Sequence, residues 1–198
     1  VAELKSTPGI NMQLFPWTRD EYVALNARPG VNGQSNPLSN EKVRQALNYD
    51  TNKNAIIQIV THGVGTPMTS FMSTGTPLHV GTTPLYPYDL AKAKQLLSDA
   101  GFPNGFETTL DLLAGNEDEI GIGTALQQMW GQAGVKLDLQ QEDNATRTGQ
   151  YRNGTLDMRL SVWTDDIADP NEIASYFLYY PNIQSNHSGW KNDEVDKL

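Results

Sequence analysis

Apolar and polar residues alternate in three short stretches of the second half of the chain, and segments with helical spacing separate these stretches. The stretches 109–113, 135–139 and 157–163 place apolar residues at every second position, which predicts three strands with one apolar face each. Apolar residues recur every three or four positions over 122–133, and a shorter helix over 145–152 is expected to end at a glycine. The order strand, helix, strand, helix, strand predicts an α/β fold with a mainly parallel sheet, right-handed crossovers and flanking helices.

The first half of the chain predicts helices and extended segments. Helices are expected over 41–49, begun by Asn40 or Ser39, over 52–62, begun by Asp50-Thr51, and over 90–100, begun by Asp89. Extended runs are expected at Ile10–Trp17 and Tyr22–Asn26. The stretch 28–40 is rich in Pro, Gly, Ser and Asn, which indicates a surface connection.

Residues 64–87 follow neither period and include four prolines. We therefore expect a long irregular loop, of the kind that wraps a surface or carries function. Fully buried parallel strands usually read as continuous apolar runs, whereas the strands expected here are apolar on one face only. The second face of the sheet is therefore expected to be partly wet, or covered by chain outside this sequence.

Composition and charge narrow the classes of function. The 198 residues carry a formal net charge of −9 without any cluster of Lys and Arg, which argues against nucleic-acid binding. The absence of cysteine excludes disulfides, thiolate metal sites and a Cys nucleophile. No apolar run approaches 18 residues, so no membrane-spanning segment is expected. The sequence starts without a methionine and stops within a helical pattern, from which we expect a fragment of a longer protein.

The candidate site is the stretch 160–170, which runs from a predicted strand into a predicted helix opened by Pro170. Trp163, Thr164 and three aspartates lie in this short link, at the carboxyl end of the strand. In open α/β sheets ligands bind at that edge. By strand parity Trp163 faces away from Leu160, so we expect its ring in a cleft. Asn116, in the loop after the strand that ends at Leu113, is a further candidate for ligand contact.

Four segments resemble family 5 extracellular solute-binding proteins, the periplasmic peptide and nickel receptors of ABC importers. The resemblance begins near residue 20 and runs to the end of the chain. It rests on the following motifs, which occur in the family's order: Val43–Asp50 with Ala55-Ile56-Ile57 and Gly63; Tyr88–Gly105; Gly134-Val135 followed by Asn153-Gly154 and Asp157; and Trp163, Asp166 and Asp169-Pro170.

The resemblance implies a two-lobed protein that closes on a ligand in an interlobe cleft by a hinge motion and delivers it to a membrane permease. It implies no catalysis and no cofactor. Residues 1–198 would then form a single lobe, with the long loop at 64–87 inside it. We expect a monomer in the periplasm or anchored at the cell surface, with a peptide or another small molecule as its ligand and no nucleic-acid partner.

Residue roles carry over from the family one at a time. In peptide-binding members the aspartate three positions after the tryptophan binds the ligand's α-ammonium group, and here that residue is Asp166. Trp163 would supply a flat wall, Asp169 would cap the following helix, and Asp165 would either bind ligand, cap this helix or face water. The arginine that dipeptide-selective members place after the earlier strand is absent from Leu113–Asn116. A dipeptide is therefore not the expected ligand. A longer peptide, an amino-sugar conjugate, an opine-like compound and a metal chelate stay open.

The sequence allows two other hypotheses of function, an enzyme that uses these carboxylates and an interaction module. Asp165, Asp166 and Asp169 match a DDxxD pattern, so they could hold Mg²⁺ or serve a carboxylate-based hydrolase. Isoprenoid synthases place that pattern inside a long helix, whereas here it follows a strand and precedes Pro170. No histidine lies beside a carboxylate at metal-ligand spacing, so we expect no metal site. In the second reading, an uncovered sheet face would make the chain an interaction module.

Overall fold

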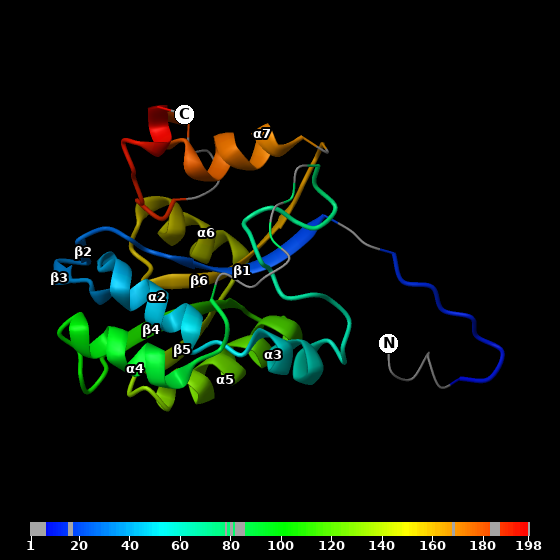
Figure 1. Cartoon of the computed structure of the whole chain (residues 1–198), viewed down its shortest axis with the longest axis horizontal. Coiled ribbons are helices and arrows are strands. Elements are labelled where there is room, and N and C mark those ends of the chain that lie inside the picture. The colour runs from blue at the N-terminus through cyan, green and yellow to red at the C-terminus, as the bar shows by residue number, and fades with distance from the viewer. Residues whose placement is uncertain are drawn as a thin grey trace.

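The computed structural model describes residues 7–15, 18–77, 79, 81, 86–167, 169–182 and 187–197. Its centre is a four-stranded sheet in the order β1-β6-β4-β5 (Figure 1). The strands are β1 Arg19–Leu25, β4 Glu107–Leu113, β5 Lys136–Glu142 and β6 Met158–Thr164. β4 pairs in parallel with both β5 and β6, whereas β1 pairs antiparallel with β6. The predicted α/β class with a mainly parallel sheet is confirmed, and the antiparallel edge strand is an addition to it.

Four helices cover one face of this sheet and bury the main hydrophobic core with it (Figure 1). They are α2 Glu41–Tyr49, α3 Lys53–Val60, α4 Leu90–Asp99 and α5 Glu117–Gly131. At the start of each helix a side chain accepts a backbone N–H group of the first turn. The capping residues are, in chain order, Asn40, Asn52, Asp89 and Asn116. The predicted caps Asn40 and Asp89 are confirmed. The helix α3 begins at Lys53 with Asn52 as its cap, so the start assigned to Asp50-Thr51 is wrong.

The second face of the sheet is covered in part by this chain itself. Lys136, Asp138 and Gln140 of β5 stay exposed on it, so the expectation of a partly wet face is confirmed there. The helix α6 Asn144–Asn153 and the π-helical turn Ala174–Leu178, which follows the short helix α7 Pro170–Ile173, lie over it (Figure 1). Phe177 is 1% exposed. The centre of its ring lies 5.9 Å from that of Tyr22 on β1 and 4.8 Å from that of Trp163 on β6. Aromatic contacts thus cover the part of this polar face that belongs to β1 and β6.

The remaining described segments are short or irregular. The connection from 28 to 40 contains a hairpin, β2 Gly30–Val31 with β3 Gln34–Ser35, and the 3₁₀ turn Pro37–Ser39. Residues 10–15 contain no strand, and Trp17 of the run expected there lies outside the described residues.

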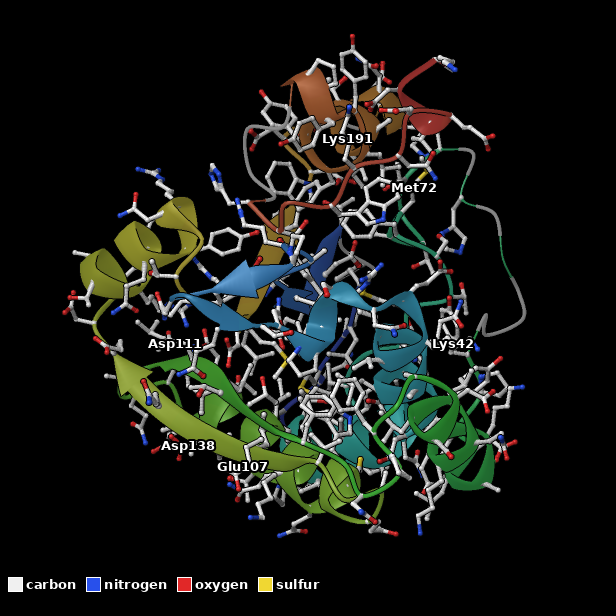
Figure 2. All side chains as sticks on the ribbon, turned by 90° about the vertical axis from the view of Figure 1, so that its left-hand side faces the viewer. Lys42, Met72, Glu107, Asp111, Asp138 and Lys191 are labelled. Carbon is white, nitrogen blue, oxygen red and sulfur yellow. The ribbon has the colours of Figure 1, made fainter. Side chains whose placement is uncertain are left out.

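The described residues between 64 and 87 lie in neither helix nor strand. Met72 of this loop lies at the same end of the molecule as Lys191, far from Glu107 and Asp138 (Figure 2). The loop therefore reaches the side of the sheet that carries the C-terminal elements. None of the described helices is long and apolar enough to cross a bilayer.

Candidate functional site

Trp163 occupies the penultimate position of β6 and faces away from the main core. It pairs across the β1–β6 ladder with Asp20, on the face opposite Leu160, so the parity argument holds. Its ring packs edge-on against Phe177 and lies 5.7 Å from the ring of Tyr176, and the side chain stays partly exposed. The sheet edge therefore presents one open indole surface on a rigid aromatic base.

Asp165 holds this indole and the long loop together. The Trp163 Nε1–H donates to Asp165 Oδ1 at 3.0 Å, and the Thr76 hydroxyl donates to Asp165 Oδ2 at 2.6 Å. Thr76 itself is buried within the loop. A short charge-assisted hydrogen bond of this kind is stronger than a neutral one. The structure thus gives Asp165 a positioning role that the sequence did not predict, and whether it also contacts ligand stays a prediction.

The backbone at Asp166 is held by the buried carboxylate of Glu172, while the Asp166 side chain points to solvent. The Glu172 side chain is 7% exposed and accepts the backbone N–H groups of Asp166, at 3.1 Å, and of Ile167, at 3.0 Å. Asp169 caps α7 by accepting the Asn171 N–H at 2.8 Å, as predicted. The Asp166 side chain is exposed and has no hydrogen bond or ion pair within the described residues. A backbone held by Glu172 thus carries an exposed carboxylate three residues after Trp163.

Replacement of Glu172 tests this clamp, the pair of hydrogen bonds from the Asp166 and Ile167 backbone N–H groups to the Glu172 carboxylate. Glu172→Ala leaves two backbone N–H groups without their acceptor, so we expect the free energy of unfolding to fall by about 1–3 kcal/mol. Glu172→Gln keeps one acceptor oxygen and should lose roughly half as much. Chemical denaturation of both variants measures the difference. Equal stability of wild type and Glu172→Ala would show that the clamp contributes nothing.

Asp20 belongs to this site although sequence reasoning did not select it. Its side chain is 9% exposed and lies across the strand pair from Trp163. Burial raises the pKa of Asp20 to about 6, and the negative charge of Asp165 adds to the rise while His79 opposes it. Two carboxylates and one indole therefore share the end of the β1–β6 pair, and the potential there is negative.

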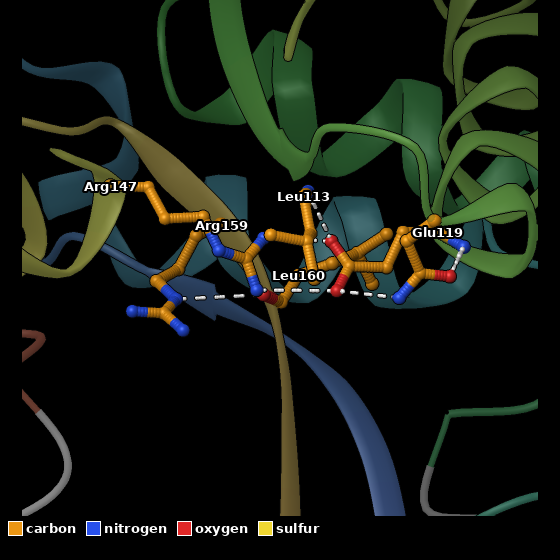
Figure 3. A network of polar contacts seen from close by, with 6 residues as sticks. Leu113, Glu119, Arg147, Arg159 and Leu160 are labelled. Carbon is orange, nitrogen blue, oxygen red and sulfur yellow. Dashed lines mark hydrogen bonds and ion pairs between the residues drawn. The ribbon is translucent and has the colours of Figure 1, made fainter. Parts of the chain in front are cut away.

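Asn116 lies at the carboxyl end of the neighbouring strand, but its side chain is occupied. Its Oδ1 accepts the Glu119 N–H at 3.2 Å as the cap of α5, and its Nδ2 donates to Glu119 Oε1 at 3.3 Å. Glu119 also accepts the Leu113 N–H and forms a buried ion pair with Arg147 (Figure 3). Within the described residues, no hydrogen bond joins Asn116 to the stretch Trp163–Asp166. Asn116 thus caps α5, and its contact with a ligand stays a prediction.

Sequence signals existed for only part of the missed residues. Glu172 stands three positions after the cap Asp169, the spacing of a capping box, although its carboxylate reaches further back than the usual partner. Asp20 and Thr76 gave no such signal, because both join the site only through contacts with distant segments. Among the described residues, no group of three or more His, Cys, Asp or Glu side chains is arranged to hold a metal ion.

The fold and the position of this site define one lobe of a two-lobed solute-binding protein. The model of the bacterial extracellular solute-binding proteins, family 5 Middle, matches residues 1–185, and the chain belongs to this family.

Similar proteins cover the chain almost completely. Heme-binding protein A of Haemophilus influenzae is 32% identical over 100% of this chain and 36% of its own length. The glutathione-binding protein GsiB of Pectobacterium atrosepticum is 35% identical over 90% of this chain and 37% of its own length. The solved structure of HbpA2 from Haemophilus parasuis superposes with a TM-score of 0.85 at 30% identity, over 99% of this chain and 38% of that one. The chain therefore spans little more than a third of these relatives.

Proposed function

We propose that this chain is one lobe of the substrate-binding component of an ABC importer. It captures a peptide-like or amine-bearing solute in a cleft between two lobes, of which residues 1–198 form one. The protein acts in the periplasm or at the cell surface, as a monomer anchored or free, and hands its ligand to a membrane permease. Membership of a family of binding proteins supports a role without catalysis.

The observation that carries this proposal is the exposed carboxylate of Asp166, which has no partner among the described residues and follows the partly exposed indole of Trp163 by three positions. A carboxylate held on a fixed backbone meets a cation without first reorganising, and a hydrogen bond to a charged group contributes about 1.5–3 kcal/mol. The indole face adds an apolar surface that also attracts cations. Asp165 and Glu172 hold these two groups in place through the hydrogen bonds described above.

The negative potential of the site favours one ligand chemistry among those in the relatives' names. Two relatives are named for binding heme and glutathione. Glutathione carries a free α-ammonium group, whereas heme carries carboxylates and no amine. A site with Asp20, Asp165 and Asp166 at one sheet edge suits the ammonium and repels a free carboxylate.

Calorimetry on the full-length protein with a library of short peptides tests the proposal. We expect Asp166→Asn to weaken binding of peptides with a free amino terminus at least tenfold, because the ion pair to the ammonium is lost. Asp138→Asn, which neutralises an exposed carboxylate on β5, is the matched control and should change little. Unchanged affinity in Asp166→Asn would remove this residue from the site.

The hydrolase alternative receives no support from the comparisons or from the geometry. Asp165 accepts hydrogen bonds from Trp163 and Thr76, Asp169 caps α7, and the Asp166 side chain has no partner among the described residues. They do not converge on a common point, as a Mg²⁺ site requires.

A further inference from the structure

In the described part of the chain, the indole of Trp163 is oriented by one hydrogen bond and by two aromatic neighbours. Its Nε1–H, the only donor on the side chain, is bonded to Asp165 Oδ1 at 3.0 Å. The ring of Phe177 meets it edge-on, with 4.8 Å between ring centres, and the ring of Tyr176 lies 5.7 Å away on a tilted plane. Ring contacts have little direction, whereas the N–H bond fixes which edge of the indole faces Asp165.

Asp165 needs an anchor of its own, because it lies in the link between β6 and α7, outside any strand or helix. Its second oxygen, Oδ2, accepts the hydroxyl of Thr76 at 2.6 Å, from a segment 89 positions earlier in the chain. The Asp165 carboxylate is therefore fixed between two donors. One donor is the indole, and the long loop supplies the other.

A second buried hydroxyl supports Thr76. Ser73 Oγ lies 2.9 Å from Thr76 Oγ1, and the two residues are 4% and 3% exposed. A hydroxyl has one proton, and Thr76 gives its proton to a carboxylate that can only accept. Ser73 is therefore the donor in this pair, and the hydrogen bonds run from Ser73 to Thr76 to Asp165. Bonds in such a chain polarise one another, which strengthens the contact with Asp165.

The long loop also packs onto the aromatic base of the indole. The centre of the Phe71 ring lies 4.9 Å from that of Phe177 and 6.1 Å from that of Tyr22. Phe177 thus contacts both the loop and Trp163. The loop therefore reaches the indole by two routes, a polar one through Asp165 and an apolar one through Phe177. Long loops without regular structure usually carry function, and these contacts indicate which function this loop has.

We propose that Thr76 and Ser73 are positioning residues for ligand binding, which act through Asp165 to hold the Trp163 indole in the orientation that the ligand meets. The inference rests on the proposed function and deepens it. The ligand contacts proposed above lie on β6 and in the link after it, whereas the groups that hold them in place come from the long loop.

The same bonds limit what Trp163 offers to a ligand. Because its Nε1–H is already held by Asp165, the indole presents ring carbons and a π face but no free donor. Such a surface suits an apolar or cationic group of the ligand and gives nothing to an acceptor such as a carboxylate. A ring that is held in place also loses less freedom on binding than a mobile one, so loss of the Thr76 bond is expected to lower the affinity.

Removal of the Thr76 hydroxyl in the full-length protein tests this role with two measurements. Calorimetry gives the affinity for Ala-Ala-Ala and for glutathione. NMR gives the rate at which the Trp163 indole N–H exchanges with water, and Trp163→Phe identifies its resonance. In Thr76→Val we expect exchange at least about tenfold faster, because Asp165 is released on one side. We expect the affinity for the better-bound probe to fall at least about fivefold.

Matched variants separate positioning from a general loss of stability. Thr76→Ser keeps the hydroxyl and should stay within about twofold of wild type in both measurements. Thr108→Val removes another buried threonine hydroxyl that donates to an aspartate, Asp157 at 3.2 Å, near the start of β4. It should lower the unfolding temperature as Thr76→Val does, but leave the affinity and the indole exchange unchanged. Ser73→Ala should change both in the direction of Thr76→Val and by less.

The outcomes keep the two proposals apart. Unchanged indole exchange in both Thr76→Val and Ser73→Ala overturns the positioning role. Faster exchange with unchanged affinity also overturns it, while the proposed function stands. An equal loss of affinity in Thr76→Ser or Thr108→Val overturns it too, because a general loss of stability then explains the effect. Binding of neither probe to wild type at millimolar concentration overturns the proposed function, and the positioning role falls with it. Thermal unfolding checks the fold of each variant.

Discussion

Replacement of Arg147 by Met is expected to reduce the free energy of unfolding of this lobe by about 3–5 kcal/mol, since it strands a buried carboxylate. Arg147 of α6 is 4% exposed and Glu119 of α5 is 8% exposed. They form a two-pronged ion pair, with Nη1 to Oε2 at 2.7 Å and Nη2 to Oε1 at 3.2 Å (Figure 3). Met fills much of the same volume but supplies neither charge nor donors.

The loss of stability in Arg147→Met is expected to exceed the loss of the Arg147–Glu119 ion pair alone. Asp111 on β4 is an enclosed carboxyl, and its burial raises its pKa to about 6. The positive charge of Arg147 opposes this rise. Without the guanidinium, Glu119 keeps only the N–H of Leu113 and its contacts with Asn116. Glu119 then lacks a cation, Asp111 keeps only the weaker field of Arg159, and we expect α6 to detach first from the sheet.

Chemical denaturation monitored by circular dichroism measures this effect. Arg147→Lys keeps the charge but loses the planar fork and should lose less than Arg147→Met. The double variant Arg147→Met with Glu119→Gln removes the stranded charge and should recover part of the stability, which a double-mutant cycle quantifies. A loss below about 1 kcal/mol in Arg147→Met would contradict a buried, cooperative pair.

The elements of this fold follow from local sequence because their signals are local. Alternation at Met158, Leu160 and Val162 predicted β6, and the caps Asn40 and Asp89 marked two helix starts. Alternation also placed Trp163 on the correct face. These signals depend on neighbours within a few residues, which is the range that periodicity and capping describe.

What the sequence did not reveal depends on distant contacts. A polar strand face ordinarily indicates solvent, yet Asp111 is 0% exposed because α6 lies over it. Asp20 joins Trp163 only through the pairing of β1 with β6, and Thr76 reaches Asp165 from a loop without any periodic signal. Asn116 was predicted to contact ligand from its position; the structure shows that it caps α5, and the ligand contact stays a prediction. Long-range pairing decides each of these roles, and no spacing rule reports it.

Asp50 is expected to make this lobe markedly more stable at pH 5 than at pH 8. It is 1% exposed at the end of α2, and both of its carboxyl oxygens are enclosed without a hydrogen-bond partner among the described residues. Burial raises the pKa of Asp50 from 3.8 to about 7, against the opposing effect of Lys94. Because one pKa unit corresponds to about 1.4 kcal/mol, this shift corresponds to on the order of 4 kcal/mol.

The sign follows from which state holds the proton. A raised pKa in the folded state means that the folded chain keeps its proton when the unfolded chain has lost it. The stabilisation is complete below pH 3.8, where both states are protonated, and is lost progressively as the pH rises through about 7. Asp111, with a pKa of about 6, acts in the same direction. The unfolding free energy should therefore fall between pH 4 and pH 7.

Asp50→Asn isolates the contribution of one group, because the amide keeps the shape of the protonated acid without titrating. We expect this variant to match wild type only below about pH 3.8, to exceed its stability increasingly as the pH rises from 4 to 7, and to show a flatter pH dependence over that range. Denaturation can be followed by the fluorescence of Trp130, which is 3% exposed and donates from Nε1 to Thr51, the residue next to Asp50. Asp138→Asn, at an exposed position, should leave the slope unchanged. If Asp50→Asn keeps the full pH slope of wild type, the enclosed carboxyl is not its source.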